Sequence, residues 1–362
     1  MELAEHARRA ARRARAFLAA KEPGHFLVNV KVPAEAPPMP PLTEIDPEKD
    51  LPRWMDGLLA AARPGWEAKA GIDDDAPPSL CPRFGIAEHS AWLGLEVRAQ
   101  ETTNLPAPAL TSLDDLSPIG PRESNPWYRY MKAGYDHLRS RQDGSFLLSV
   151  RGAMAPMDLA NAVRGDEIFV EFLTEPAGAH KLMRFLAEAE HWYYQRLRSW
   201  ADEVEGGHFY HYGGIWLGPE AIGHISNDAT MLCGPELYDE FGYPYEAELV
   251  GKYRWAFYHV HSEKLHYLPR LVQLPKLALL EITPDPQAPP PIEDLPRIYA
   301  DTGSVNLMLH GTSDQVRAHI EEMKERNVAL TVACTDRAEA EEALAFVRGH
   351  SRPLDQLATG RA

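Results

Sequence analysis

The residues best suited to chemistry in this sequence are two histidines separated by one residue. His259 and His261 lie in a short apolar stretch, and side chains two apart on a strand point to the same face. Neutral imidazoles suit Zn²⁺, and a thiolate such as that of Cys334 would suit it further. The sequence therefore predicts a zinc site of His259, His261 and Cys334, with Glu281, Glu88 or water in the fourth position. In the alternative interpretation, the histidines only hydrogen-bond a substrate and Cys334 packs as a small apolar residue.

Other polar side chains stand at the ends of predicted strands, where barrel enzymes place their catalytic groups. Asp228 could act as an acid, a base or an acceptor for substrate donors, or it could be a turn residue. Arg151 could clamp an anionic group, or it could form an internal salt bridge. We expect Asp228, Arg151 and Glu88 to be catalytic. We expect the substrate to contact five further residues: Asn227, Tyr258, His89, His310 and Asn29.

Short apolar stretches alternate with longer helical ones along the chain, which is typical of a parallel sheet. The predicted strands are Phe26–Val32, Phe84–His89, Ser145–Arg151, Ala221–Asn227, Ala256–His261, Leu277–Thr283, Val305–His310 and Val328–Cys334. The predicted helices are Glu175–Val204, Pro235–Tyr253, Ser313–Arg326, capped by Thr312 or Ser313, and Ala338–Arg348.

Eight strands alternating with helices predict an α/β fold closed as a (β/α)₈ barrel. We expect one domain over residues 1–362, with a helical segment over 1–25 and a core barrel over about 26–350. Three Pro-rich segments, Pro33–Pro52, Thr102–Pro126 and Pro284–Pro296, interrupt the alternation. Long loops inside a compact domain are usually functional or disordered, and we expect the first two to form walls of the site.

Composition narrows the function classes. The formal net charge is −16, which disfavours nucleic acid as a partner because its binding needs a basic surface. No stretch approaches the length of a membrane helix, so no membrane association is expected. The three cysteines are widely spaced and do not suggest a disulfide framework, which points to a reducing cytoplasm. A small-molecule substrate is the expected partner.

Several segments together resemble the uroporphyrinogen decarboxylase superfamily. Ser226-Asn227-Asp228, followed by Pro235–Phe241 and Pro244-Tyr245, is similar to its fourth strand and the helix after it. Leu148–Pro156 is similar to its third strand and turn, and the histidine pair matches a His-rich motif in its next strand. The likeness covers roughly residues 145–348. The arginine-rich N-terminal motif of the porphyrin decarboxylases is missing, because the equivalent stretch reads Phe26-Leu27-Val28-Asn29-Val30-Lys31-Val32.

The resemblance implies a cobalamin-dependent methyltransferase-like enzyme. In that branch zinc is bound by His-x-Cys in strand five and by a Cys in the last strand; here His259 and Cys334 match, and His261 replaces the first Cys. Zinc would be the cofactor, with a corrinoid supplied by a partner protein, and the resemblance also suggests a homodimer. A metal-free decarboxylase or other lyase acting on a carboxylate is the alternative function, and a non-catalytic ligand-binding barrel is the second alternative.

Overall fold

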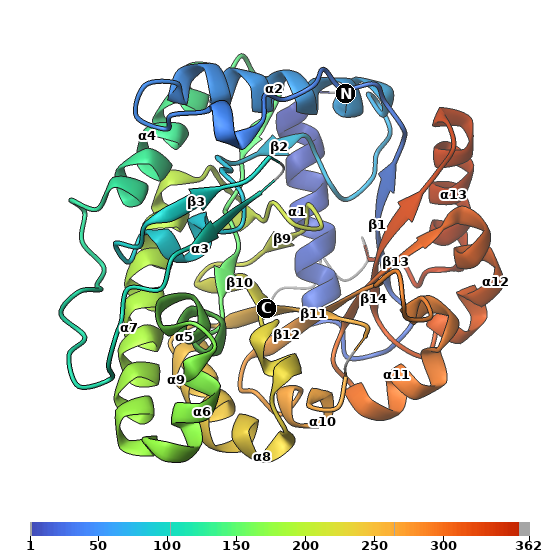
Figure 1. Cartoon of the computed structure of the whole chain (residues 1–362). Coiled ribbons are helices and arrows are strands. Elements are labelled where there is room, and N and C mark those ends of the chain that lie inside the picture. The colour runs from blue at the N-terminus through green and yellow to red at the C-terminus, as the bar shows by residue number, and fades with distance from the viewer. Residues whose placement is uncertain (1, 102, 264, 355–362) are drawn as a thin grey trace.

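A parallel sheet of seven strands forms the centre of the computed structural model, which describes residues 2–101, 103–263 and 265–354 (Figure 1). From one edge to the other, its strands are β1 (Phe26–Lys31), β14 (Val328–Ala333), β13 (Leu307–Thr312), β12 (Leu277–Thr283), β11 (Trp255–His261), β10 (Ala221–Ser226) and β6 (Ala153–Met154). Every pairing in this sheet is parallel. The predicted α/β class is therefore confirmed.

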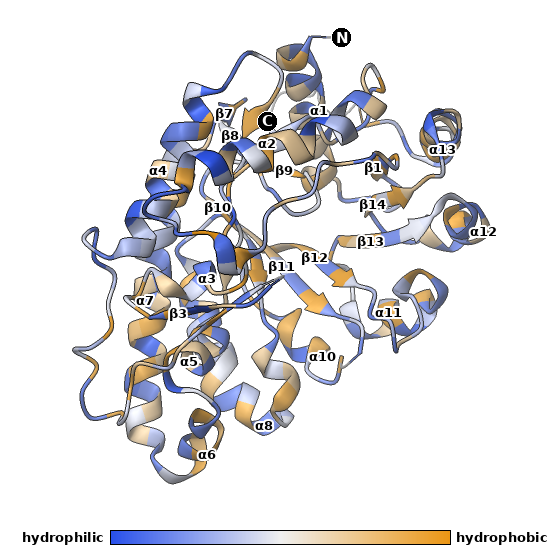
Figure 2. Cartoon of the chain, turned by 45° about the horizontal axis from the view of Figure 1, so that its top comes forward, coloured by the Kyte–Doolittle hydropathy of each residue, from blue (hydrophilic) through white to orange (hydrophobic). Residues whose placement is uncertain are grey.

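Helices precede, connect and follow these strands and bury the outer face of the sheet. The longer ones are α1 (Leu3–Ala19), α2 (Leu51–Ala68), α4 (Pro126–Ser140), α5 (Pro156–Arg164), α6 (Glu167–Thr174), α7 (Pro176–Trp200), α9 (Tyr243–Gly251), α11 (Leu295–Thr302), α12 (Ser313–Met323) and α13 (Arg337–His350). They carry both hydrophilic and hydrophobic residues (Figure 2), as expected for helices with one buried face. No helix in the described ranges is both long and apolar enough to cross a membrane.

Short strands make up three smaller sheets beside the central one. β2 (Ser79–Leu80) pairs in parallel with β5 (Leu147–Leu148), and β3 (Val97–Ala99) pairs with β4 (Asn104–Pro106) in an antiparallel hairpin. The third sheet is antiparallel and consists of β7 (Glu203–Val204), β8 (Gly207–Phe209) and β9 (Trp216–Leu217).

The predicted second strand, Phe84–His89, is wrong. Its end forms the short helix α3 (Glu88–Ala91), and the strand of this region lies earlier, at β2. Gly85 has a positive φ of 111°, and a Cβ there would overlap the Asn104 side chain, whose Oδ1 accepts a hydrogen bond from the Ala87 N–H (2.8 Å). A positive φ and a side-chain amide bound to the backbone produce a turn, which interrupts an otherwise strand-like apolar run.

The five strands from β10 to β14 begin and end within two residues of their predicted bounds. The predicted strand Ser145–Arg151 is shortened to β5. The helix predicted over Pro235–Tyr253 is divided into α8 (Pro235–Leu237), a π-helical turn at Tyr238–Gly242 and α9. Pro244 lacks the N–H that a continuous α-helix would need there. The helix predicted over Glu175–Val204 ends at Trp200, and its last residues form β7.

The remaining helices and turns are short: α10 (Leu268–Leu271) and three 3₁₀ turns at Leu42–Glu44, Ala229–Leu232 and Pro291–Glu293. The single domain expected over 1–362 stays a prediction. Residues 1, 102, 264 and 355–362 of that range lie outside the described residues, and Thr102 is the first residue of the second Pro-rich segment.

A capping box begins α12 directly after β13. The Thr312 hydroxyl accepts from the Gln315 N–H (3.2 Å), and the Gln315 side chain accepts from the Thr312 N–H (2.9 Å), so the predicted cap is Thr312. We expect Thr312→Ala to lower the free energy of unfolding by about 1 kcal/mol, because it leaves an amide without a partner. Thr312→Ser keeps the hydroxyl and should match the wild type within about 0.5 kcal/mol in urea unfolding. Equal loss in both variants would contradict the capping role.

Candidate metal centre in the strand-end cavity

A cavity of about 1150 Å³ lies at the carboxyl ends of the central strands. Strands β10 to β13 supply its polar floor: His224, Ser226, His259, Glu281, Thr283 and His310. Met39–Leu42 of the first Pro-rich segment and Trp54 and Leu58 of α2 form an apolar wall, as expected for that segment. From the second Pro-rich segment only Thr103 lines the cavity among the described residues.

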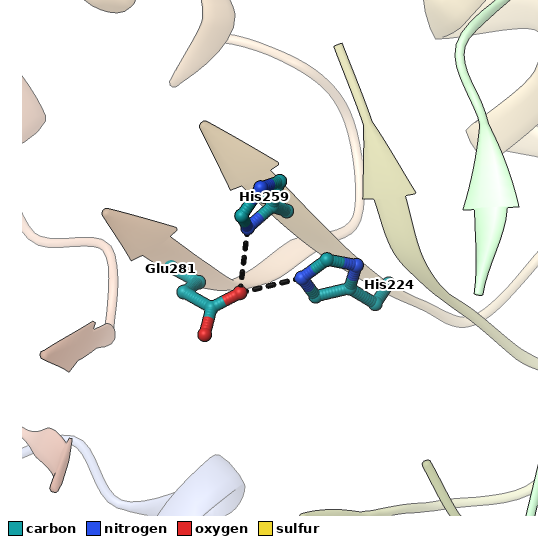
Figure 3. Close-up of side chains that lie close together, drawn as sticks. All are labelled: His224, His259 and Glu281. Carbon is teal, nitrogen blue, oxygen red and sulfur yellow. Dashed lines mark hydrogen bonds and ion pairs between the residues drawn. The ribbon is translucent and has the colours of Figure 1, made fainter. Parts of the chain in front are cut away.

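The Glu281 carboxylate accepts hydrogen bonds from three imidazoles. His224 Nε2 (2.5 Å) and His259 Nδ1 (2.7 Å) donate to Oε2, as Figure 3 shows, and His310 Nε2 (2.7 Å) donates to Oε1. Burial alone would favour the neutral acid, but the electrostatic interaction with the His224 ring and these hydrogen bonds outweigh it and hold the pKa of Glu281 well below its ordinary value. Glu281 is therefore an ionised acceptor that orients three rings.

His224 is a neutral donor in this arrangement. Burial and then the neighbouring His259 lower its pKa to about 4, against the opposing effect of Glu281. It sits at a bulge between β10 and β11, and bulges commonly redirect a side chain next to a site. The ring also stacks on Tyr212 with the two centroids 4.3 Å apart.

A second carboxylate orients the other histidine of the pair. His261 Nδ1 donates to Asp285 Oδ1 (2.8 Å), and the Glu263 N–H donates to Asp285 Oδ2 (2.9 Å). With the protons of His259 and His261 assigned to Nδ1 by these bonds, the Nε2 atom of each ring carries a lone pair. Those two Nε2 atoms lie 3.3 Å apart, and Asp228 Oδ1 lies 3.6 Å from His261 Nε2.

Two groups of side chains could hold a metal ion by proximity: His224 with His259 and Glu281, and Asp228 with His259 and His261. Ligand atoms about 2.1 Å from a tetrahedral zinc lie about 3.4 Å from one another. The 3.3 and 3.6 Å separations in the second group fit that spacing. The 2.5 and 2.7 Å separations in the first group are hydrogen-bond lengths. Asp228, His259 and His261 are therefore the candidate ligands, and Glu281 lies behind His259 as its hydrogen-bond acceptor.

Cys334 does not join this centre. It belongs to neither group, and its buried Sγ contacts the Val332 carbonyl oxygen (3.7 Å). The register pairs His310 with Thr331, so the cavity side of β14 carries Thr331, while Val332 and Cys334 point to the opposite side. The predicted ligand set is thus corrected: the structure brings His259 and His261 together but replaces Cys334 with Asp228.

Strand alternation also corrects two predicted substrate contacts. Asn227 and Tyr258 are fully buried and do not line the cavity. Tyr258 lies between His259 and Phe257 on β11, so its side chain points to the helix side of the sheet when His259 points into the cavity. On that outer side Tyr258 lies next to Glu246, a carboxyl whose pKa burial raises to about 7. His89 and His310, by contrast, line the cavity as expected.

Arg151 lines the cavity, and Glu88 forms an ion pair with Arg151 on the side away from the cavity. The Arg151 Nε donates to the Glu88 carboxylate, and both side chains are buried. The guanidinium lies over the Tyr212 ring, 4.8 Å from its centroid, and its Nη1 has no hydrogen-bond partner among the described residues. Glu88 is on α3 and does not line the cavity. It therefore serves as the counter-ion of Arg151, and not as the catalytic group that we expected.

Asn29 lies away from the cavity. Its Nδ2 donates to the Gly213 carbonyl oxygen (2.9 Å) and its Oδ1 accepts from Lys69 (3.4 Å), so Asn29 helps to hold the loop that carries Tyr212. The predicted substrate contact is not made in this cavity, and Asn29 borders a smaller adjoining cavity instead. Neither His224 nor Tyr212 is among the predicted site residues. The alternation that puts Ser226 and Asp228 on one face also includes His224, whereas no sequence pattern places Tyr212 between Arg151 and His224.

We expect Glu281→Gln to lower the free energy of unfolding by about 3 kcal/mol, because it removes a buried charge that three imidazoles satisfy. Urea unfolding measures the effect. Glu263→Gln makes the same change on an exposed side chain and should stay within about 0.5 kcal/mol of the wild type. Equal stability of the two variants would contradict the central role of the Glu281 carboxylate.

Cys334 should react as an ordinary buried thiol. Burial, followed by the charges of Glu339 and Asp336, raises its pKa to about 11, so on the order of one thiol in a thousand is ionised at pH 8. We expect iodoacetamide to label Cys334 much more slowly than free cysteine at pH 8, with a rate that rises as the pH approaches 11. Mass spectrometry of the labelled peptide measures it, with guanidinium-unfolded protein as the control. Rapid labelling at pH 7 would contradict the raised pKa.

Comparisons with known proteins do not indicate a function for this chain. No family model matches the chain, and no curated protein sequence matches it significantly. A function therefore has to be argued from the contacts of Asp228, His259, His261, Glu281 and Arg151.

Proposed function

We propose that this chain is a zinc-dependent enzyme that acts on a carboxylate-bearing small molecule, with Asp228, His259 and His261 as the metal ligands. The observation that carries the proposal is the 3.3 Å separation of His259 Nε2 and His261 Nε2. Each ring is bound at Nδ1 by a different carboxylate. Two neutral nitrogens this close repel one another unless a cation or a proton lies between them.

The surroundings of the two histidines fit a metal. Metal-binding histidines almost always donate their other N–H to a carboxylate or a carbonyl, and Glu281 and Asp285 accept those protons here. Three protein ligands would leave a fourth position for water or substrate, as in catalytic zinc sites. When bound, a zinc ion would supply a Lewis acid for a carbonyl or carboxylate oxygen.

Arg151 is the group that would hold the substrate. Its Nη1 has no partner and the side chain borders the cavity, while the Glu88 ion pair fixes the guanidinium in place. Arginine recognises carboxylates and phosphates with paired hydrogen bonds. A carboxylate bound to Arg151 would extend toward the imidazoles, because Tyr212 contacts both Arg151 and His224.

The oxygen and nitrogen ligands favour a lyase reaction on a carboxylate over methyl transfer to a thiol. Cys334 belongs to neither group of possible ligands and its pKa is raised to about 11, so it supplies no thiolate to the metal. The metal-free form of the lyase, the methyl transfer, its corrinoid partner and the homodimer remain predictions. A non-catalytic ligand-binding barrel is the outcome that an absence of turnover would favour.

We further propose that the central sheet closes into a (β/α)₈ barrel of the uroporphyrinogen decarboxylase type. The β2–β5 pair would fill the gap between β1 and β6. In support, the Asp75 N–H just before β2 donates to the Val28 carbonyl oxygen of β1 (2.7 Å).

Zinc stoichiometry tests the centre. We expect about one zinc per chain by elemental analysis after loading and gel filtration, because three ligands and two supporting carboxylates are in place. Asp228→Ala, His259→Ala and His261→Ala should each reduce bound zinc at least tenfold, whereas Cys334→Ala should bind as much as the wild type. Circular dichroism confirms that each variant is folded.

No zinc in the loaded wild type, or zinc lost in Cys334→Ala alone, would overturn the assignment.

The reaction class has its own test, which is release of CO₂ from small carboxylates in the presence of zinc. Release should cease on chelation and in Arg151→Met. Release that persists after chelation would favour the metal-free lyase.

A further inference from the structure

A second, smaller chamber adjoins the strand-end cavity. It has a volume of about 250 Å³, and Arg83 lines both spaces. Its other basic borders are Lys31 at the end of β1, Lys69 after α2, and His211 after β8. Asn29, Ser79 and the Trp66 ring are also part of its wall. We call this space, defined by Lys31, Lys69, Arg83 and His211, the cationic chamber.

Positive charge in the cationic chamber is poorly matched by the protein. No Asp or Glu is among the described residues that line it, although the chain carries a net charge of −16. Lys69 has a partner, because its Nζ donates to the buried Asp74 (2.6 Å). Lys31 and Arg83 have no carboxylate within ion-pair distance in the part of the chain that the structure describes, and the buried Nε of Arg83 has no hydrogen-bond partner there.

The pKa values of Lys31 and His211 are both lowered in this concentration of positive charge. Desolvation, followed by the charge of Lys69, lowers the pKa of Lys31, although Asp74 opposes this shift and Lys31 is an exposed residue. Burial, together with the charges of Arg83, Arg151 and Lys31, holds the pKa of His211 well below its ordinary value. Gathering cations away from carboxylates costs free energy, and an anion in the chamber would offset that cost.

We infer that the cationic chamber binds an oxyanion, the second anionic group of a substrate whose first carboxylate binds Arg151. The inference rests on the proposed function for the first carboxylate but not on the metal. A chamber of this volume holds a carboxylate or a phosphate group with little else, since whole small-molecule sites are usually larger. The substrate class is therefore a dicarboxylate or a phosphorylated carboxylate. The same chemistry would also accept free phosphate.

Calorimetric titration of chelator-treated protein in an amine buffer tests the chamber. The probes are inorganic phosphate, glutarate as a dicarboxylate and butyrate as a monocarboxylate. We expect glutarate to bind and butyrate to bind at least tenfold more weakly, because a second charged contact contributes roughly that factor. Lys31→Met and Arg83→Met should each weaken glutarate binding roughly tenfold.

Lys132→Met removes the same charge from an exposed lysine of α4 and should leave the affinity unchanged. Arg83→Lys keeps a charge and should bind more tightly than Arg83→Met. Phosphate that binds more tightly than glutarate, with the same dependence on Lys31 and Arg83, would assign the chamber to free phosphate. Absence of saturable binding, or wild-type affinity for glutarate in both Lys31→Met and Arg83→Met, would overturn the inference. Because the protein is chelator-treated, failure of the metal centre would not change these affinities and would be seen separately, in the zinc stoichiometry.

Discussion

The organisation of the site depends on one ionised carboxylate that is buried among imidazoles. Glu281 takes hydrogen bonds from His224, His259 and His310, which come from β10, β11 and β13, while Glu281 itself is on β12. A buried charge is tolerated only when hydrogen bonds satisfy it. The register of four neighbouring strands is therefore tied to this contact, since a slip of one residue would turn a donor to the opposite face.

The same contact determines what the two cavity histidines can do. Because Glu281 and Asp285 accept the Nδ1 protons, the Nε2 atoms of His259 and His261 face each other across 3.3 Å. Without those carboxylates either ring could rotate or change its tautomer. The strand that carries the pair is therefore not sufficient by itself to make a site, and the second carboxylate must come from the residue that follows β12.

Apolar periodicity is enough to predict β10 to β14 and α12, because these strands are long and bounded by turn residues. It predicts neither α10 nor α11, which also lie between these strands. β2 has only two residues, Ser79 and Leu80, which is too short for a pattern, whereas the stronger apolar run at Phe84 predicts a strand. The alternation rule that correctly united His259 and His261 also excludes Tyr258, and applying it to β14 excludes Cys334. Contacts such as Tyr212 between Arg151 and His224 depend on a loop path that no local pattern encodes.

The two sides of the candidate metal centre differ in how firmly the protein holds them. His259 and His261 are fixed by carboxylates, whereas the Asp228 side chain is 51% exposed and accepts from the Ser226 hydroxyl (3.1 Å). Its backbone N–H is held by the buried Asp158 carboxylate (3.1 Å), so the position of the residue is fixed while its carboxylate can still turn. A preorganised imidazole pair with an adjustable third ligand suits a centre that must bind a metal and also admit a substrate beside it.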